Sequence, residues 1–266
     1  MKQKETNIKA AFYIPFGYLY GVRLRSIAKL LSWLLLYILP TAFYAAVGYS
    51  GSWALFALHY VLVLLATFTL YELGYIFNDT YAIRRENAPS LRLNEDELRY
   101  FFAHQWTIIA TRVLIAMLCL GVLSFWLPIL PVSLAILTMC ILFAIYNRWR
   151  NNYNVFLYIW LVFSRYLPFM MLCEHGVQDY LFLFLSYPLL IGIERFSMPR
   201  YRWRVMRRII PTEEAKTRFR VWYYTLLLCI ATPLMILFDQ DICLLIPIFI
   251  LWIYRLVRYF LKRFML

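Results

Sequence analysis

The sequence contains none of the short motifs that are typical of common soluble catalytic sites. It has no His-Glu-x-x-His pair, no glycine-rich phosphate loop and no Cys-x-x-Cys spacing, so nothing in it indicates a zinc protease, a P-loop nucleotide site or a dithiol centre. The five cysteines lie within or at the ends of apolar runs. A free cysteine in such surroundings behaves as a small hydrophobic residue, and we interpret all five as packing residues.

Two further patterns are missing, and each absence narrows the fold class. A transmembrane barrel would show alternating ten-residue segments, which the chain lacks. Residues 1–28 are basic and aromatic and contain no compact apolar stretch of the kind found in a cleavable signal peptide. Instead, 64% of the residues are hydrophobic and 20% are aromatic. A chain of this composition hides its surface in lipid, so the sequence predicts an all-α polytopic membrane protein.

The apolar runs predict how many times the chain crosses the bilayer. Each is close to the ~20 residues that one crossing requires. We predict a bundle of about eight transmembrane helices forming one domain, residues 29–266, after a cytoplasmic or interfacial basic-aromatic arm, residues 1–28. The expected spans are 29–48, 53–78, 102–126, 128–147, 155–173, 180–198, 219–238 and 242–261.

Acidic residues are scarce, with 14 Asp and Glu against 27 Lys and Arg and a net charge of +13. The links after the first, third, fifth and seventh expected spans contain no Lys or Arg. Nearly all the basic residues lie in the other links, at the termini or at the span ends that adjoin them, whereas Arg112 and Arg165 fall inside spans. This asymmetry predicts that both termini and the active face are cytoplasmic, in an integral protein of a bacterial inner membrane. It fits contact with anionic bilayer lipids and requires no nucleic-acid partner.

The second expected span ends in a group of polar residues. Glu72, Asn78 and Asp79 lie there, and the paired arginines Arg84 and Arg85 follow. Carboxylates and carboxamides are costly to place in lipid, and inside a membrane protein they are usually functional. We therefore interpret this group as a candidate site for chemistry.

This pattern resembles the UbiA superfamily of intramembrane prenyltransferases. The first motif of that family, Asn-Asp-x-x-Asp-x-x-x-Asp at the cytoplasmic end of the second helix, falls here on Asn78, Asp79, Ala82 and Glu86. Residues 87–92 resemble the family's basic, proline-containing loop. The second acidic motif, after the sixth helix, falls near Glu194, which is the one carboxylate present there.

The resemblance implies a UbiA-like helical bundle and a transferase that uses Mg²⁺ to bind a diphosphate. Its catalytic residues would be Asn78, Asp79 and Glu86, and its metal ligands would be Asp79, Glu86 and Glu194. Magnesium prefers hard oxygen ligands. Asp79 and Glu86 are seven residues apart, which is ~10 Å along a helix. They can bind one ion only if the helix ends between them, because Ala82 replaces the carboxylate that would bridge the gap.

Arginines surround both motifs and are suited to phosphate. A guanidinium binds phosphate through two parallel hydrogen bonds and stays charged. We therefore interpret the arginines as replacing part of the metal site by direct cationic contact. The alternative is that these arginines anchor the protein to anionic lipid. The candidate phosphate-binding residues around the motifs are Arg84, Arg85, Arg92, Arg195 and Arg200.

Arg112 and Arg165 lie inside apolar spans, as does Glu72. Charges within the membrane usually face the bundle interior and pair. Two interpretations stay open: a structural ion pair of Glu72 with Arg112 or Arg165, or a cationic wall that binds an anionic headgroup. Tyr75, next to the motif, is a candidate for lining an isoprenoid channel and shielding a carbocation through its ring.

The sequence thus predicts a membrane-embedded transferase acting on a polyprenyl-linked phosphate or diphosphate. Two chemistries compete within the resemblance: prenyl transfer to an aromatic or lipid acceptor, and phosphoribosyl transfer onto a polyprenyl phosphate. The expected partners are an isoprenoid or polyprenyl-phosphate lipid and bilayer lipids, and a protein partner is compatible with the sequence. The alternative is a non-catalytic UbiA-like membrane subunit or a lipid or small-molecule transporter.

Overall fold

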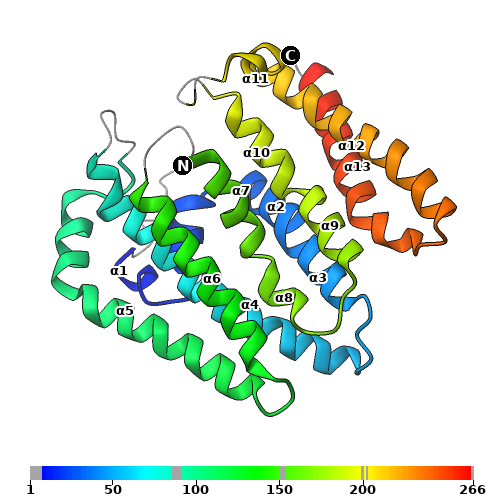
Figure 1. The fold of residues 1–266 in the computed structure, drawn as a ribbon. Helices are drawn as coiled ribbons and strands as arrows, with labels where there is room; N and C mark the ends of the chain where they lie inside the picture. Colours follow the sequence, from blue (N-terminus) through cyan, green and yellow to red (C-terminus); the bar gives the residue numbers. More distant parts are fainter. Residues whose placement is uncertain (1–7, 86–90, 150–153, 199–200, 202, 265–266) are drawn as a thin grey trace.

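The computed structural model describes residues 8–85, 91–149, 154–198, 201 and 203–264, and for residues 84, 85, 262 and 264 it describes the backbone only. Every regular element in these ranges is helical (Figure 1). In chain order the elements are α1 Ile8–Ala11, η1 Leu19–Arg23, α2 Ile27–Trp33, η2 Leu34–Ile38, α3 Leu39–Ala46, α4 Trp53–Thr80, η3 Ala82–Arg85, α5 Glu95–Leu123, α6 Ile129–Arg148, α7 Asn154–Ser164, α8 Leu167–Met170, α9 Val177–Ser186, α10 Pro188–Phe196, α11 Arg204–Ile209, α12 Glu213–Leu237, η5 Ile242–Leu245 and α13 Ile246–Phe264.

Six helices in the described part of the chain are long and apolar enough to cross a membrane, and the bent pair α9 and α10 makes a seventh span if it is counted as one. The all-helical, multi-pass character predicted from the sequence is therefore present. The expected span 155–173 takes a different form. It is a shorter apolar stretch, Asn154–Met170, that is divided into α7 and α8.

The long helices begin at residues that can satisfy free backbone amides. Ser52 and Thr212 accept hydrogen bonds from backbone amides at the starts of α4 and α12. At the start of α5, Asn94 and Glu97 form a reciprocal capping box. Each cap replaces a hydrogen bond that the first turn of a helix cannot make internally.

Three spans are irregular near their middles. The first contains the π-helical segment η2. The second is interrupted at Arg165 and Tyr166, between α7 and α8. The third bends by 41° at Tyr187, where Pro188 begins α10 without an amide hydrogen to donate. Backbone that leaves the helical pattern inside a membrane protein must find partners in the protein itself, and it often does so around a binding site.

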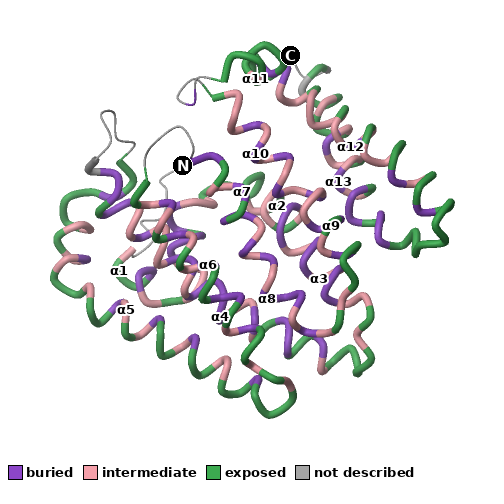
Figure 2. The backbone as a smooth tube through the Cα atoms, in the orientation of Figure 1, coloured by how far each residue is buried: buried purple, intermediate pink, exposed green. Residues whose placement is uncertain are grey.

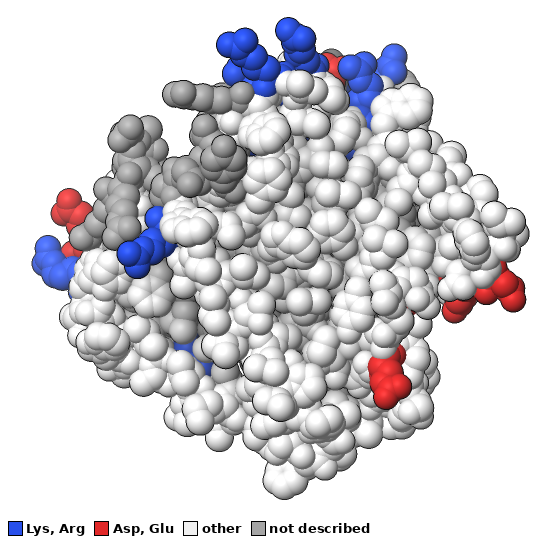
Figure 3. Space-filling model, viewed as in Figure 1, with Lys and Arg blue, Asp and Glu red and all other residues white. Residues whose placement is uncertain are grey.

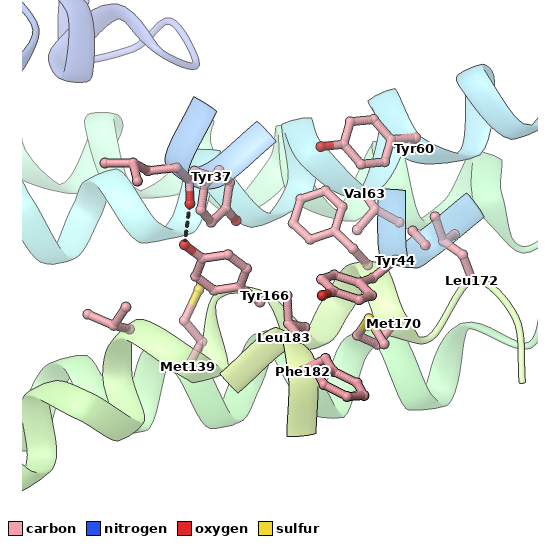
Figure 4. Close-up of a cluster of buried hydrophobic side chains, with 14 of the residues drawn as sticks. Tyr37, Tyr44, Tyr60, Val63, Met139, Tyr166, Met170, Leu172, Phe182 and Leu183 are labelled. Atoms are coloured by element: carbon pink, nitrogen blue, oxygen red, sulfur yellow. Dashed lines mark hydrogen bonds between the residues drawn. The ribbon is translucent and has the colours of Figure 1, made fainter. Parts of the chain in front are cut away.

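Tyrosine hydroxyls join two of these irregular segments. Tyr37 of η2 donates to the carbonyl of Arg165 at 2.7 Å. In return, Tyr166 donates to the carbonyl of Leu36 at 2.8 Å (dashed line in Figure 4). The rings of Tyr37 and Tyr166 pack edge to face, with centroids 4.8 Å apart. The π-helical segment and the interruption at Arg165 therefore satisfy one another's backbone.

Two adjacent tyrosines of α12 perform the same task at the bend between α9 and α10. Tyr223 donates to the carbonyl of Leu185 and Tyr224 to that of Ser186, each at 2.6 Å. The last carbonyls of α9 would otherwise be unpaired in an apolar interior. Side chains of a neighbouring helix thus stabilise this bend.

The N-terminal segment, residues 8–25, packs against α4 and α5. Phe12 and Tyr18 are fully buried and form a cluster with Ile76, Phe101 and Ile108. The sequence predicted an arm at the membrane surface, and the structure gives this arm a buried core of its own. The long outer helices, in contrast, turn exposed apolar faces away from the bundle, as the green stretches of α5 and α12 show (Figure 2).

Charged side chains gather at two ends of the molecule and leave a broad uncharged band between them (Figure 3). Basic residues of α11, among them Arg204, Arg207 and Arg208, are exposed at one end. Exposed Asp239 and Asp241 lie in the turn between α12 and α13, at the other. An apolar band of this kind is what a membrane-spanning protein presents to lipid.

Candidate functional site

Asp79, in the last turn of α4, is the centre of a cluster of hydrogen bonds. Its side chain is buried, and both of its oxygens accept from Arg23, at 2.7 and 2.8 Å. Arg92 and Asn78 donate to one oxygen at 2.9 and 3.0 Å, and the Tyr18 hydroxyl donates to the other at 2.9 Å. The sequence grouped Asn78, Asp79 and Arg92, and the structure brings these three together. Arg23 and Tyr18 were not anticipated.

The donors around Asp79 decide whether it fits a metal site. Both carboxylate oxygens are surrounded by hydrogen-bond donors, two of them cationic, which is the opposite of a magnesium coordination shell. Ala82 brings no ligand, and no group of three His, Cys, Asp or Glu side chains among the described residues is placed to hold a metal ion. Glu86 lies outside those residues. In this arrangement the described residues do not fit a resident Mg²⁺, and the predicted Mg²⁺ remains a prediction.

Glu72 and Arg112 form a fully buried ion pair at 2.8 Å. Arg112 also donates to the carbonyls of Phe12, Thr69, Ala11 and Ile14. Of the two interpretations offered for Arg112, the structure shows the structural ion pair. All of the guanidinium's donor nitrogens are used internally, so Arg112 is not free to bind a substrate as predicted.

Arg165 has a different environment. Its guanidinium lies over the rings of Tyr37, Tyr166 and Tyr71, at 4.9, 5.4 and 5.8 Å from their centroids. No carboxylate among the described residues pairs with it, and its Nε is buried without a hydrogen-bond partner. Tyrosine faces stabilise a cation but leave its hydrogen-bond donors free. Arg165 is thus a half-buried cation whose buried Nε retains capacity for an anion.

Arg195 and Glu194, at the end of α10, point to different partners. Arg195 lies 3.5 Å from the ring centroid of Tyr158 and donates to the Tyr146 hydroxyl at 2.6 Å. Glu194 is buried and accepts two hydrogen bonds from Arg220 of α12, at 2.5 and 2.7 Å. Glu194, predicted as a metal ligand, is neutralised by an arginine, as Asp79 is.

Aromatic rings connect the Asp79 cluster to Glu194. Arg23 lies 4.4 Å from the ring centroid of Tyr75, which packs against Tyr71 beneath Arg165. Tyr187 then interacts electrostatically with both Arg165 and Glu194. We refer to these groups as the arginine–tyrosine network. Its members are Arg23, Arg92, Arg165, Arg195, Arg220, Tyr37, Tyr71, Tyr75, Tyr146, Tyr158, Tyr166 and Tyr187, with the carboxylates Asp79 and Glu194.

An apolar groove adjoins this network between α4 and α6. Its volume is about 630 Å³, and Tyr71, Gly74, Phe77, Met139 and Phe143 are among its lining residues. This volume lies in the range of small-molecule sites. The groove shares Tyr71 with the surroundings of Arg165, so an apolar chain in the groove would end beside that cation.

The remaining predicted residues are only partly described. Glu86 and Arg200 lie outside the described residues, and Arg84 and Arg85 end the short helix η3 with only their backbone described. Arg220 was not among the predicted site residues; it lies at the very start of the expected span 219–238, about two turns after the start of α12. The Tyr187-Pro188 pair could have indicated the bend.

The chain was compared with protein-family models, curated proteins and solved structures, and none of the three comparisons finds a match.

Proposed function

We propose that this protein is a membrane-embedded transferase that acts on a polyprenyl-linked phosphate or diphosphate. One observation carries the proposal: Arg165 is a half-buried guanidinium whose buried Nε has no hydrogen-bond partner, and it is held among tyrosine rings next to an apolar groove. An arginine cannot lose its proton in a protein, so burial without a counter-ion is costly. A phosphate on an isoprenoid chain satisfies both features, since its charge meets the cation and its chain fills the groove.

The network suggests how the substrate would be held. The isoprenoid chain would lie along Phe143 and Phe77 in the groove, with its phosphate at Arg165. Arg195 and Arg92 would contact a second phosphate or a second anionic substrate. Asp79 would position Arg23 and Arg92 by its hydrogen bonds. It would not bind the substrate itself.

Both chemistries implied by the resemblance use this arrangement. In prenyl transfer the allylic C–O bond breaks, the diphosphate leaves with the electron pair, and the acceptor loses a proton as it bonds to the allylic carbon. The guanidinium groups would stabilise the leaving diphosphate, and Tyr71 and Tyr75 would face the allylic cation. In phosphoribosyl transfer the polyprenyl phosphate is the acceptor, and the arginines would hold two anionic substrates together.

The proposed topology has about eight crossings in a bacterial inner membrane, with both termini and the active face cytoplasmic. The broken stretch α7–α8 would be one of the crossings, its interruption satisfied by Tyr37 and Tyr166. Exposed basic side chains lie at one end together with acidic ones such as Glu213, whereas the turn at the other end carries the exposed Asp239 and Asp241, and this asymmetry supports the orientation.

Turnover by the purified protein in nanodiscs tests the proposal. The assay offers polyprenyl phosphates, prenyl diphosphates and phosphoribosyl diphosphate, with and without Mg²⁺. We expect turnover by the wild type, at least a hundredfold loss in Arg165→Gln, and normal turnover in Arg258→Gln, which changes an exposed arginine of α13. Equal activity in the wild type and Arg165→Gln would refute the role of Arg165. The absence of turnover with every substrate pair in the assay would refute the proposal that the protein is a transferase.

A second candidate is a non-catalytic membrane subunit or a lipid or small-molecule transporter. It is favoured by the neutralisation of Asp79 and Glu194, which leaves neither carboxylate as a free base or metal ligand. Interrupted helices that meet inside a bundle are also typical of transporters. Binding of polyprenyl phosphate that depends on Arg165, without turnover of any substrate pair, would support this candidate.

A further inference from the structure

The most unusual charge outside the predicted site is Arg255 on α13. It is only 4% exposed, and its Nε is buried without a hydrogen-bond partner. No carboxylate among the described residues forms an ion pair with it. The ring of Tyr254 lies 5.1 Å from its guanidinium.

The groups that face Arg255 come from α12, from α10 and from the bend between α9 and α10. It interacts electrostatically with Arg220 and Tyr224 of α12, with Glu194 of α10 and with Tyr187 at the bend. Glu194 does not neutralise it, because both Glu194 oxygens are used by Arg220. Lys216 also lies 4.0 Å from Glu194, and the exposed Glu213 pairs with Lys216 at 3.5 Å. The three cations Arg255, Arg220 and Lys216 therefore outnumber the carboxylates Glu194 and Glu213, and the cluster carries an excess positive charge.

Such a cluster is destabilising unless something compensates for it. A guanidinium stays protonated in a protein, and a charge buried without a partner opposes folding. Fixed cations that face one another, next to a tyrosine, form the donor set that binds a phosphate group. Tyr187 also interacts with Arg165, so this cluster adjoins the surroundings of Arg165.

We propose that Arg255 and Arg220, together with Tyr187, form a second anion-binding site, which takes the phosphate or diphosphate group of a second substrate. This inference rests on the proposed function only in naming phosphate as the anion. The site is separate from the Asp79 cluster and from the groove between α4 and α6, neither of which includes Arg220 or Arg255. Two anions would thus be bound, one at Arg165 and one at Arg255, with Tyr187 interacting with both arginines.

The test measures binding to the full-length protein in detergent and in nanodiscs. Unfolding temperature is followed against the concentration of inorganic diphosphate in one arm and of farnesyl monophosphate in the other, because a ligand that binds the folded state raises this temperature. The variants are Arg255→Gln, Arg255→Lys and, as a matched control on the exposed face of the same helix, Arg258→Gln.

We expect at least one probe to stabilise the wild type and Arg258→Gln equally. Arg255→Gln should raise the probe concentration needed for the same stabilisation at least tenfold. Arg255→Lys should raise it less, because lysine retains the positive charge and loses only the two parallel hydrogen bonds of the guanidinium. The ligand-free Arg255→Gln protein should unfold at a higher temperature than the wild type, since it lacks the uncompensated charge. A response to inorganic diphosphate would identify a water-soluble substrate, and a response to farnesyl monophosphate alone would identify a lipid headgroup.

Two results would overturn the site. One is the absence of stabilisation of the wild type by either probe. The other is an unchanged response in Arg255→Gln together with a lower unfolding temperature, which is the behaviour of a purely structural arginine. Neither result bears on turnover. Failure of the transferase proposal is recognised separately, by inactivity in an assay that this experiment does not use.

Discussion

The carboxylate of Glu72 and the guanidinium of Arg112 lie 2.8 Å apart inside the bundle, and together they hold the N-terminal segment in place. Glu72 accepts from the backbone amides of Phe16 and Leu19, and Arg112 donates to carbonyls of the same segment. Two intramembrane charges that might be taken for a substrate site are therefore used to fix a stretch of irregular backbone.

The first prediction concerns this pair. Arg112→Met should lower the free energy of unfolding by about 3–5 kcal/mol, because it leaves Glu72 buried without a counter-ion. Denaturation in mixed micelles measures the change. Arg99→Gln, an exposed arginine on the same helix, should change stability by less than about 0.5 kcal/mol. The double variant Glu72→Gln with Arg112→Met should recover part of the loss, and a double variant no better than Arg112→Met would contradict the pairing.

The second prediction concerns Asp79. Asp79→Asn should abolish turnover, and it should also loosen the N-terminal segment, because Arg23 and Tyr18 lose the charge that they share. We expect about 2 kcal/mol of destabilisation, less than for a fully buried pair because Arg23 and Arg92 reach water.

Hydrogen exchange locates this effect. Amides of residues 12–25 should exchange faster in Asp79→Asn, while those in α12 should keep the wild-type rate. Asp96→Asn, an exposed aspartate at the start of α5, is the control. If turnover is lost but exchange of the N-terminal segment is unchanged, Asp79 acts in catalysis directly, and the positioning role proposed for it is wrong.

Local sequence was enough to predict the helices and the neighbourhood of the motif. The apolar runs are long, and Asn78, Asp79 and Arg92 are close in the chain, which favours their association. The capping box at Asn94 and Glu97 likewise follows from four consecutive residues.

The ion pair of Glu72 with Arg112 was one of two sequence interpretations, but most contacts between distant parts of the chain were beyond sequence reasoning. Arg23 reaches Asp79 from 56 residues away, and Arg220 reaches Glu194 from 26 residues away. Pro168, in the first turn of α8, is a local signal for the interruption at Arg165, but Tyr37, which supports the interruption, is 128 residues distant. A hydropathy pattern places such arginines at the ends of spans. Only the packing of the helices shows which of their side chains are enclosed by the protein.

The third prediction concerns the tyrosines at the interrupted spans. Tyr166→Phe leaves the Leu36 carbonyl without its hydrogen bond in an apolar surrounding. This should destabilise the protein by about 1–3 kcal/mol with no change of charge. Tyr37→Phe should have an effect of similar size through the Arg165 carbonyl. Tyr20→Phe, at an exposed position, should be neutral, and equal stability of all three variants would show that the hydroxyls do not support the breaks.

The fourth prediction concerns Cys173, in the loop between α8 and α9. Burial and the nearby Asp179 carboxylate raise the pKa of its thiol to about 11. The thiolate is the reactive form. At pH 8 only about one thiol in a thousand is ionised, so alkylation should be slow and should accelerate about tenfold per pH unit up to about pH 11.

Iodoacetamide labelling of a variant that keeps Cys173 as its sole cysteine measures this profile. A variant that keeps only the exposed Cys243 gives the comparison rate for an accessible thiol. Adding Asp179→Asn to the Cys173 variant should move the profile toward lower pH, because one of the two causes of the raised pKa is removed. Labelling of Cys173 that levels off near pH 9, as for an ordinary thiol, would show that the loop leaves this side chain open to water and that its hydrogen bonds to Ala45 and Val47 do not persist.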